Sequence, residues 1–321
     1  MNCLVTGATG FIGAHLVREL VGKGHKVRII ARQKSKTELL AGLNIEIRYG
    51  DITKKSSIDG FFDNVDIVFH CAGLLGAFGI DKSTYYDVNV LGTKNVVDVS
   101  YGVHVKKFVL CSSAGVIGPT EKYQGDENSL YNPTNVYEQT KMEAEHIVKQ
   151  GGLDYVILRP GFVYGEGDSH LLELCKALLK RQFCFIGKAD AQLQPLYIND
   201  LVDAFLLCAS NKIHNETYII AGHEQVSVRD FIMVITQALG IALPRVWIPL
   251  WMAYGAALAF EFLAYVTKCK PLVTVQRVKF FTNSRVFTIS KAERGLQFHP
   301  QTTVSDGVRK TINWYRRQEI L

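Results

Sequence analysis

Residues 3–13 read CLVTGATGFIG, a short apolar run followed by three glycines at G-x-x-G-x-x-G spacing. The run predicts a buried strand, and the apolar spacing over 11–21 predicts a helix. In such a turn the first glycine bends the chain, the second lets the backbone approach a pyrophosphate, and the third lets the helix pack on the strand. The phosphates would meet free N–H groups at the helix N-terminus. We therefore predict a nucleotide site rather than a purely structural turn, formed by Gly7, Thr9, Gly10, Phe11, Ile12 and Gly13.

The strand-then-helix pattern repeats along the first half of the chain. Apolar runs at 3–6, 26–30, 45–48, 66–70, 107–112 and 155–158 alternate with helical spacing at 11–21, 85–100 and 135–150. Such continuously apolar strands are typical of a parallel sheet covered on both faces. We predict an α/β fold, a Rossmann-type doubly wound parallel sheet with a smaller C-terminal substrate-binding domain.

The expected domain boundaries follow from where this alternation stops. The first domain would span 1–165 plus about 195–210, where one more strand–helix unit returns to the sheet. The second domain would comprise 166–194 and 211–321.

The composition excludes several classes of protein. The chain has 321 residues, 48% hydrophobic and 21% charged, which excludes a disordered chain. Its seven cysteines show no C-x-x-C spacing and its histidines no ligand spacing, so we propose no metal site. Met1 runs almost directly into the first apolar strand, so we expect no secretory leader, reduced cysteines and a cytoplasmic protein, with membrane association as an option.

The net charge of +6 is unevenly distributed. Residues 221–321 carry a net charge of +7, and residues 1–220 carry −1. This excess indicates either a solvated basic surface or an anionic partner such as a lipid headgroup surface. No Lys/Arg block is dense enough for a nucleic-acid-binding arm, so we expect no nucleic acid partner.

Residues 246–266, VWIPLWMAYGAALAFEFLAYV, form an apolar stretch with the single charge Glu261. Its length approaches that of a membrane span, but Glu261 lies deep within it and Pro249 near its start. Three interpretations remain open: a span, a fully buried core helix, or a helix at the substrate mouth that makes peripheral contact with a membrane interface. Arg245 precedes the stretch, and Lys268 and Lys270 follow it.

The end of the second strand predicts which nicotinamide nucleotide is bound. A site that prefers NAD usually has Asp or Glu there to bind the ribose hydroxyls. Residues 27–34 read VRIIARQK and contain no acid. Arg32, assisted by Lys34 or Lys36, could pair with a 2′-phosphate, so we favour NADP over NAD. The alternative is that these are simply exposed loop cations.

Tyr137 and Lys141 lie four residues apart at the start of the predicted helix over 135–150. This spacing places both side chains on one face. A free tyrosine has a pKa near 10, and a neighbouring ammonium favours the phenolate. Tyr137 could then accept or donate the proton of a reacting hydroxyl group, with Ser113 close by at a strand end.

Together these motifs resemble the extended short-chain dehydrogenase/reductases, which include the NAD-dependent epimerase/dehydratases. The resemblance covers almost the whole chain and rests on residues 6–13, 50–52, 70–73, 89–93, 111–116, 137–141, 158–168 and 197–202. It implies Ser113 as the catalytic serine, Tyr137 as the acid–base group, and Lys141 as the residue that holds the ribose. Thr140 replaces the more usual serine, and Ile117 stands where many members carry tyrosine.

The resemblance also implies which residues bind the cofactor. Asp51 and Ile52 would flank the adenine, and the backbone after Pro160 would meet the nicotinamide amide. The cofactor would be lined in addition by Cys71, Ala72, Gly73, Asn89 and Val163. Asn89 has the alternative role of fixing backbone between two helices, and His70 is expected to be a packed residue rather than a catalyst.

Phe162 indicates the class of substrate. Many nucleotide-sugar enzymes of this superfamily carry an Asn at this position of R-x-x-N-x-Y-G, and an aromatic ring cannot replace its hydrogen bonds. Residues 248–251, 246–266, 271–274, 290–293 and 314–315 resemble the 3β-hydroxysteroid dehydrogenase branch, its relatives that reduce β-keto lipids, and flavonoid reductases. We expect Leu75, Ser113 and Phe162 to contact a small hydrophobic substrate.

The leading hypothesis is an NADP-dependent oxidoreductase that interconverts a secondary alcohol and a ketone on a steroid-, β-keto-lipid- or flavonoid-like molecule. A nucleotide-sugar epimerase or dehydratase is the alternative. A third hypothesis is a nucleotide-binding sensor or scaffold without turnover, which would not need the set of Ser113, Tyr137 and Lys141. The resemblance also implies a homodimer through two helices of the first domain. The apolar faces of 85–100 and 135–150 fit this, and core packing would give the same pattern.

Overall fold

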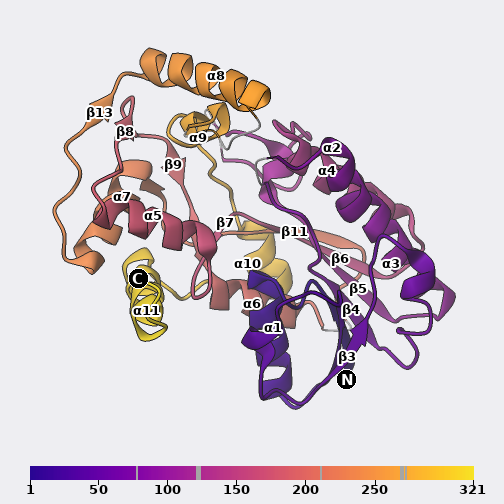
Figure 1. The fold of residues 1–321 in the computed structure, drawn as a ribbon. Coiled ribbons are helices and arrows are strands. Elements are labelled where there is room, and N and C mark those ends of the chain that lie inside the picture. The colour runs from indigo at the N-terminus through magenta and orange to yellow at the C-terminus, as the bar shows by residue number, and fades with distance from the viewer. Residues whose placement is uncertain (77–78, 121–123, 210–211, 268–270, 272) are drawn as a thin grey trace.

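A seven-stranded parallel sheet forms the centre of the molecule, shown in Figure 1 as a computed structural model. The structure describes residues 1–321 except 77–78, 121–123, 210–211, 268–270 and 272. The strand order is β3-β2-β1-β4-β5-β6-β11. These strands are β1 Asn2–Thr6, β2 Lys26–Ala31, β3 Ile45–Tyr49, β4 Ile67–His70, β5 Lys107–Cys111, β6 Tyr155–Pro160 and β11 Glu216–Ile220. The predicted α/β, Rossmann-type fold is confirmed.

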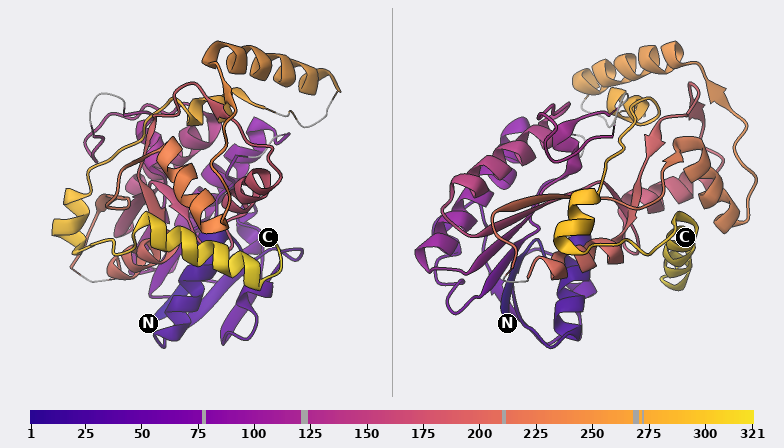
Figure 2. Two further views of the ribbon diagram at one scale, coloured as in Figure 1. Left: turned by 90° about the vertical axis from the view of Figure 1, so that its left-hand side faces the viewer. Right: turned by 180° about the vertical axis from the view of Figure 1, so that it is seen from behind.

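Helices cover both faces of the sheet, because side chains of opposite parity along each strand enter two different cores (Figures 1 and 2). Cys3 and Val5 of β1 pack with the helices of one face, whereas Leu4 packs with those of the other. The first face is covered by α1 Phe11–Gly22 and α6 Ile198–Leu207. The second is covered by α3 Gly92–Gly102 and α4 Val136–Gln150.

The second half of the chain contributes a smaller group of helices and two-stranded sheets at the carboxyl edge of the main sheet (Figure 2). Its helices are α5 Ser169–Leu179, α7 Val228–Leu239, α8 Leu250–Thr267, α9 Val275–Phe280 and α11 Val304–Arg317, whereas α10 Ser290–Leu296 packs against β11 of the main sheet. Its short strands are β7 Phe162–Tyr164, β8 Phe185–Ile186, β9 Gln192–Leu193, β10 Pro195–Tyr197, β12 Val226–Ser227 and β13 Trp247–Ile248. Helix α2 Lys82–Tyr86 and a π-helical turn at Asp87–Leu91 precede α3.

One expected strand lies elsewhere. The strand–helix unit near 195–210 exists as β10 and α6, but β10 pairs with β7 and does not join the main sheet. The seventh strand is instead β11, which pairs with β6 and falls within the range expected for the smaller domain. Both segments are short and apolar, so hydrophobic periodicity alone could not decide which of them completes the sheet.

Residues 250–267 of the apolar stretch form α8, and β13 precedes it. The interpretation as a fully buried core helix is wrong, since Trp251, Leu258 and Phe262 are exposed. Across the described residues, no helix has the length and hydropathy needed to cross a membrane. The flanking Lys268 and Lys270 lie outside the described residues.

Candidate active site

The predicted glycine turn lies where β1 meets α1, against the end of β4. Gly7 has a φ of +68°, and a Cβ there would lie 2.5 Å from the backbone nitrogen of Ala72. A Cβ on Gly13 would collide with the carbonyl oxygen of Gly7. Gly10 is the N-cap of α1, and no side chain caps it. Thr9, Phe11 and Ile12 therefore surround a helix N-terminus whose first N–H groups can bind an anion.

The turns after β2 and β3 lie beside this glycine turn along the carboxyl edge. The Gly50 N–H donates to the carbonyl of Ala31 at 3.0 Å, which ties the ends of the two strands together. Arg32 and Lys36 are exposed after β2. The Asp51 carboxylate accepts hydrogen bonds from the backbone and side chain of Thr53, both at 2.9 Å, so it closes its own turn.

His70 is a structural residue at the centre of this edge, as expected. Its Nδ1 lies 2.7 Å from Thr6 Oγ1, and its Nε2 lies 3.0 Å from Thr93 Oγ1. Thr6 Oγ1 accepts from the Ala72 N–H, and Thr93 Oγ1 donates to the Asn89 carbonyl. This arrangement favours the tautomer with the proton on Nε2. Burial, followed by the charge of Lys141, lowers the pKa of His70 to about 3, so the ring stays neutral.

Asn89, on the π-helical turn, joins the loop after β4 to α4. Its Oδ1 accepts from the Leu74 N–H at 2.7 Å, and its Nδ2 donates to the Leu74 carbonyl and to Thr140 Oγ1. The side chain thus fixes backbone and orients the first turns of α4. Thr140, the residue that departs from the more usual serine, supplies the accepting hydroxyl here.

The structure brings the three predicted catalytic side chains together at the end of β5. Asn135 caps α4 by accepting from the Glu138 N–H at 3.0 Å, which starts the helix just before Tyr137. The side chain of Ser113 lies close enough to that of Tyr137 to influence its pKa. Lys141 lies one turn later and donates from Nζ to the Cys111 carbonyl at 2.8 Å. A Cβ on Gly73 would lie 2.9 Å from that same Nζ.

Burial is the main influence on the ionisation of this set. It raises the pKa of Tyr137 well above the ordinary value, while the neighbouring Ser113 works in the opposite direction. It lowers the pKa of Lys141. The spacing of Tyr137 and Lys141 predicts a lowered pKa for Tyr137, but burial leaves this pKa raised.

A buried ion pair that the sequence analysis did not identify holds α4 against β6. The Glu145 carboxylate, fully buried, accepts from Arg159 Nε at 2.9 Å and from Nη2 at 2.7 Å. Ser112 and Tyr131 donate to it as well, at 2.6 and 2.7 Å. Glu145 follows Lys141 by one helical turn, and this spacing is the signal that could have revealed it.

The residues expected to contact the substrate come from the loop after β4 and from β7. Leu75 is exposed in the loop that Asn89 holds. Phe162 makes aromatic contacts with Phe231, at 5.6 Å between ring centroids, and with Phe280, at 6.1 Å. The sequence analysis missed both partners, because they come from α7 and α9. Pro160 ends β6, and Val163 lies in β7.

Other parts of the site also differ from, or go beyond, the expectations. The Cys71 thiol is hydrogen-bonded to that of Cys111 in the neighbouring strand, so its backbone rather than its side chain lies against Gly7. The side chain of Ile52 is buried against Gly92 and does not face the solvent. Among the described residues, no group of His, Cys, Asp and Glu side chains has the geometry of a metal site.

Comparisons with known proteins agree with this geometry. A model of the NAD dependent epimerase/dehydratase family matches residues 3–221. Sterol demethylase protein B of Methylococcus capsulatus is 28% identical, with full coverage of both chains. A 3 beta-hydroxysteroid dehydrogenase/Delta 5→4-isomerase of Mycobacterium tuberculosis is 30% identical over 97% of this chain and 90% of that protein. The crystal structure of a UDP-glucuronic acid 4-epimerase from Bacillus cereus superposes with a TM-score of 0.78, at 24% identity and 99% coverage of both chains.

Replacing Glu145 with Gln should destabilise the protein strongly at neutral pH. It leaves the buried Arg159 guanidinium without a counter-charge, which typically costs about 3–5 kcal/mol. Burial alone would raise the pKa of Glu145, but the bonds from Arg159, Ser112 and Tyr131 lower it below the ordinary 4.5. The pair thus stabilises the fold above pH 4.5 and less as the pH falls below it. Urea unfolding from pH 7 to pH 3 should show the difference between variant and wild type shrinking below pH 4.5.

The double variant Glu145→Leu with Arg159→Met is the matched control. It removes both charges, so it should be more stable than Glu145→Gln alone. A pH-independent difference between wild type and Glu145→Gln would contradict the assignment of the stabilisation to the ionised carboxylate.

Proposed function

The chain belongs to the NAD dependent epimerase/dehydratase family and is an extended short-chain dehydrogenase/reductase, and on that premise we propose that it interconverts a secondary alcohol and a ketone on a hydrophobic substrate. The observation that carries this proposal is that Ser113 and Tyr137 are neighbours, with Lys141 one turn away and held by the Cys111 carbonyl, beside the glycine turn. The sterol-enzyme names of relatives that align over nearly the whole chain support it.

The residues at the carboxyl edge fit a nicotinamide dinucleotide. Gly7 and Gly13 leave the space that side chains would fill, and Gly10 leaves the N-terminus of α1 uncapped for a pyrophosphate. The backbone of Cys71, Ala72 and Gly73 continues this surface toward Lys141. When bound, the nicotinamide would supply or accept the hydride; the chain supplies the proton and the orientation.

Tyr137 would handle the proton of the reacting oxygen. The hydroxyl groups of Tyr137 and its neighbour Ser113 would both hold that oxygen. Because burial raises the pKa of Tyr137, the phenol is protonated at neutral pH and poised to protonate an alkoxide in the direction of reduction. Positive charge beyond that of Lys141 is needed before it can act as a base in oxidation, and an oxidised nicotinamide ring would supply it.

The aromatic contacts of Phe162 support a hydrophobic substrate. Rings from three separate elements, β7, α7 and α9, meet at this position and offer apolar contact rather than hydrogen bonds. We further propose that Arg32 and Lys36 pair with a 2′-phosphate, so that NADP binds more tightly than NAD. Both are exposed after β2, and the one nearby carboxylate expected at the adenine, Asp51, is already bonded to Thr53.

Replacing Tyr137 with Phe should lower kcat by about a hundredfold or more, because the acid–base hydroxyl is lost. The dissociation constant for NADP should stay nearly unchanged, as measured by fluorescence titration. Tyr155→Phe is the matched control, since Tyr155 lies at the opposite end of β6 and should retain activity. Full turnover by Tyr137→Phe would rule out this role.

Replacing both Arg32 and Lys36 with Ala should weaken NADP binding by roughly ten- to a hundredfold, because charge-assisted hydrogen bonds to the 2′-phosphate are lost. NAD binding should change little. Lys23→Ala, an exposed cation at the other end of α1, is the control. Equal losses for the two nucleotides would show that these cations do not select NADP.

Thermal unfolding with saturating NADP should distinguish the substrate classes. A ligand at a hundred times its Kd stabilises by about 2.7 kcal/mol. We expect a further rise in Tm with a 3-ketosteroid or β-keto lipid and none with UDP-glucose. Phe162→Asn should lose the rise caused by the ketone but keep the rise caused by NADP. A rise with UDP-glucose alone would move the protein to the nucleotide-sugar class.

A further inference from the structure

Helix α8 buries its small apolar side chains against the protein and exposes its large ones. An ordinary surface helix does the reverse. The inward face consists of small residues, with Ala253, Ala257 and Ala264 all buried. The outward face is large and apolar: Trp251 is 76% exposed, Leu258 61% and Phe262 69%. Met252, Leu263 and Val266 are exposed as well. A helix that packs only on its own protein points its large apolar residues inward.

The single charge of α8 does not interrupt this outward face. Glu261 Oε1 accepts a hydrogen bond from the Val275 N–H at 2.9 Å, at the start of α9. The carboxylate therefore fastens α8 to α9 on the inner side. The sequence of residues 250–267 contains no other charged residue, and the large exposed side chains described on α8 are apolar.

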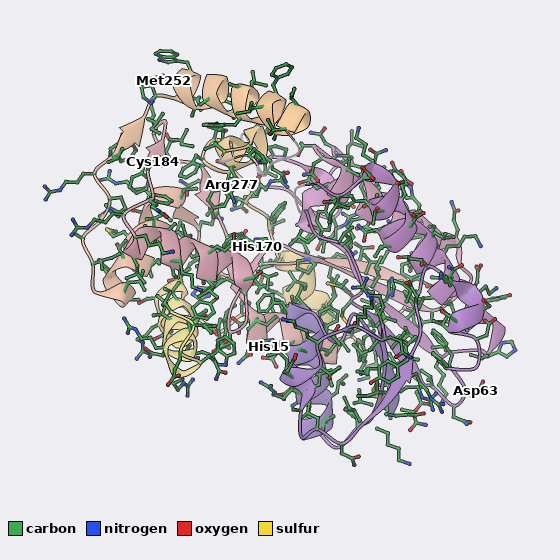
Figure 3. All side chains as sticks on the ribbon, in the orientation of Figure 1. His15, Asp63, His170, Cys184, Met252 and Arg277 are labelled. Atoms are coloured by element: carbon green, nitrogen blue, oxygen red, sulfur yellow. The ribbon has the colours of Figure 1, made fainter. Side chains whose placement is uncertain are left out.

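The apolar surface continues into the segment before α8. Val246 is exposed, and Trp247 is partly exposed while it stacks on Phe185 at 4.5 Å. Figure 3 shows side chains that project from α8 away from the rest of the molecule, at the edge that Met252 marks. We define the outward residues of α8 with Val246 and Trp247 as the α8 patch. Contiguous exposed apolar surface of this kind marks an interaction site.

Basic residues flank α8 in the sequence, and Arg245 and Arg229 lie beside the N-terminal end of the α8 patch. Residues 245–285 contain six Lys or Arg and a single acid, the inward Glu261. Arg245 is exposed beside Val246, and Arg277 is exposed on α9, on the inner side of α8 in Figure 3. Arg229 lies over the Trp247 ring at 5.9 Å. This composition, apolar at the centre and positive at the border, matches the acyl chains and anionic headgroups of a bilayer surface.

We propose that the α8 patch docks onto an anionic lipid surface, with α8 lying in the plane of the interface. A second copy of the chain is a poorer occupant, because a two-fold interface would bring the same positive border against itself. The docking does not depend on the proposed substrate, since the α8 patch shares no residue with the Ser113–Tyr137 site.

Vesicle co-sedimentation tests the proposal with the full chain and bound NADP. The wild type should bind vesicles of phosphatidylcholine mixed with phosphatidylglycerol, and bind pure phosphatidylcholine more weakly. Leu258→Asp with Phe262→Asp should lower the partition coefficient between vesicles and water by at least about tenfold. The variant loses two apolar side chains that would enter the bilayer. Leu130→Asp is the matched control: Leu130 is 87% exposed but lies outside the α8 patch, and its replacement should leave binding unchanged.

Charge and folding are checked separately. Arg245→Glu with Arg277→Glu should remove the preference for phosphatidylglycerol, and all variants should keep the thermal shift caused by NADP. Failure of the wild type to bind, or unchanged binding by Leu258→Asp with Phe262→Asp, would overturn the proposal. So would sedimentation equilibrium that shows a dimer in the wild type and a monomer in that double variant. Brominated acyl chains should quench the tryptophan fluorescence of the wild type, and quench that of Trp251→Phe less.

Discussion

The close approach of Gly7 to the Ala72 backbone is the constraint on which the candidate site depends. Parallel strands end at one edge, so the turns after β1 and β4 must share the same space, and a single Cβ at Gly7 would push them apart. The hydrogen-bond chain from Ala72 through Thr6, His70 and Thr93 to Asn89 then fixes the depth of both turns. These groups are neutral, buried and hydrogen-bonded to one another. The position of the two turns therefore does not depend on a side chain that changes its charge near neutral pH.

Helix α4, which carries Tyr137 and Lys141, is attached to this edge at several points along its length. Asn89 holds Thr140 near its start, and Glu138 forms an ion pair with Arg285 from the C-terminal part of the chain at 2.8 Å. Glu145 anchors the next turn to Arg159 of β6. Tyr137 directly precedes the first of these anchors and Lys141 lies between the last two, so their positions are determined by the sheet and by the second half of the chain together. Such support is what a proton transfer over hydrogen-bond distance requires.

Local sequence contains most of this arrangement but not all of it. The strands from β1 to β6 and the helices α1 and α4 follow from periodicity, and the glycine turn from its spacing. The competition between β10 and β11 for the sheet depends on long-range packing, which no window of sequence records. The same holds for Phe231 and Phe280 around Phe162, and for Arg159 under Glu145. The pKa of Tyr137 could not be read from the Tyr–Lys spacing either, because burial outweighs it.

The inward alanines of α8 connect the outer surface to the candidate substrate site. Small residues let α8 lie close to α9, and Glu261 fixes the start of α9. Helix α9 in turn places Phe280 against Phe162. Helix α9 therefore lies between the α8 patch, which suits a lipid surface, and the aromatic side chains around Phe162, which suit an apolar substrate. A molecule that dissolves in the bilayer is rare in water, so an enzyme that acts on it gains from holding its apolar wall next to the membrane. The two proposals thus support each other physically, although each rests on its own side chains.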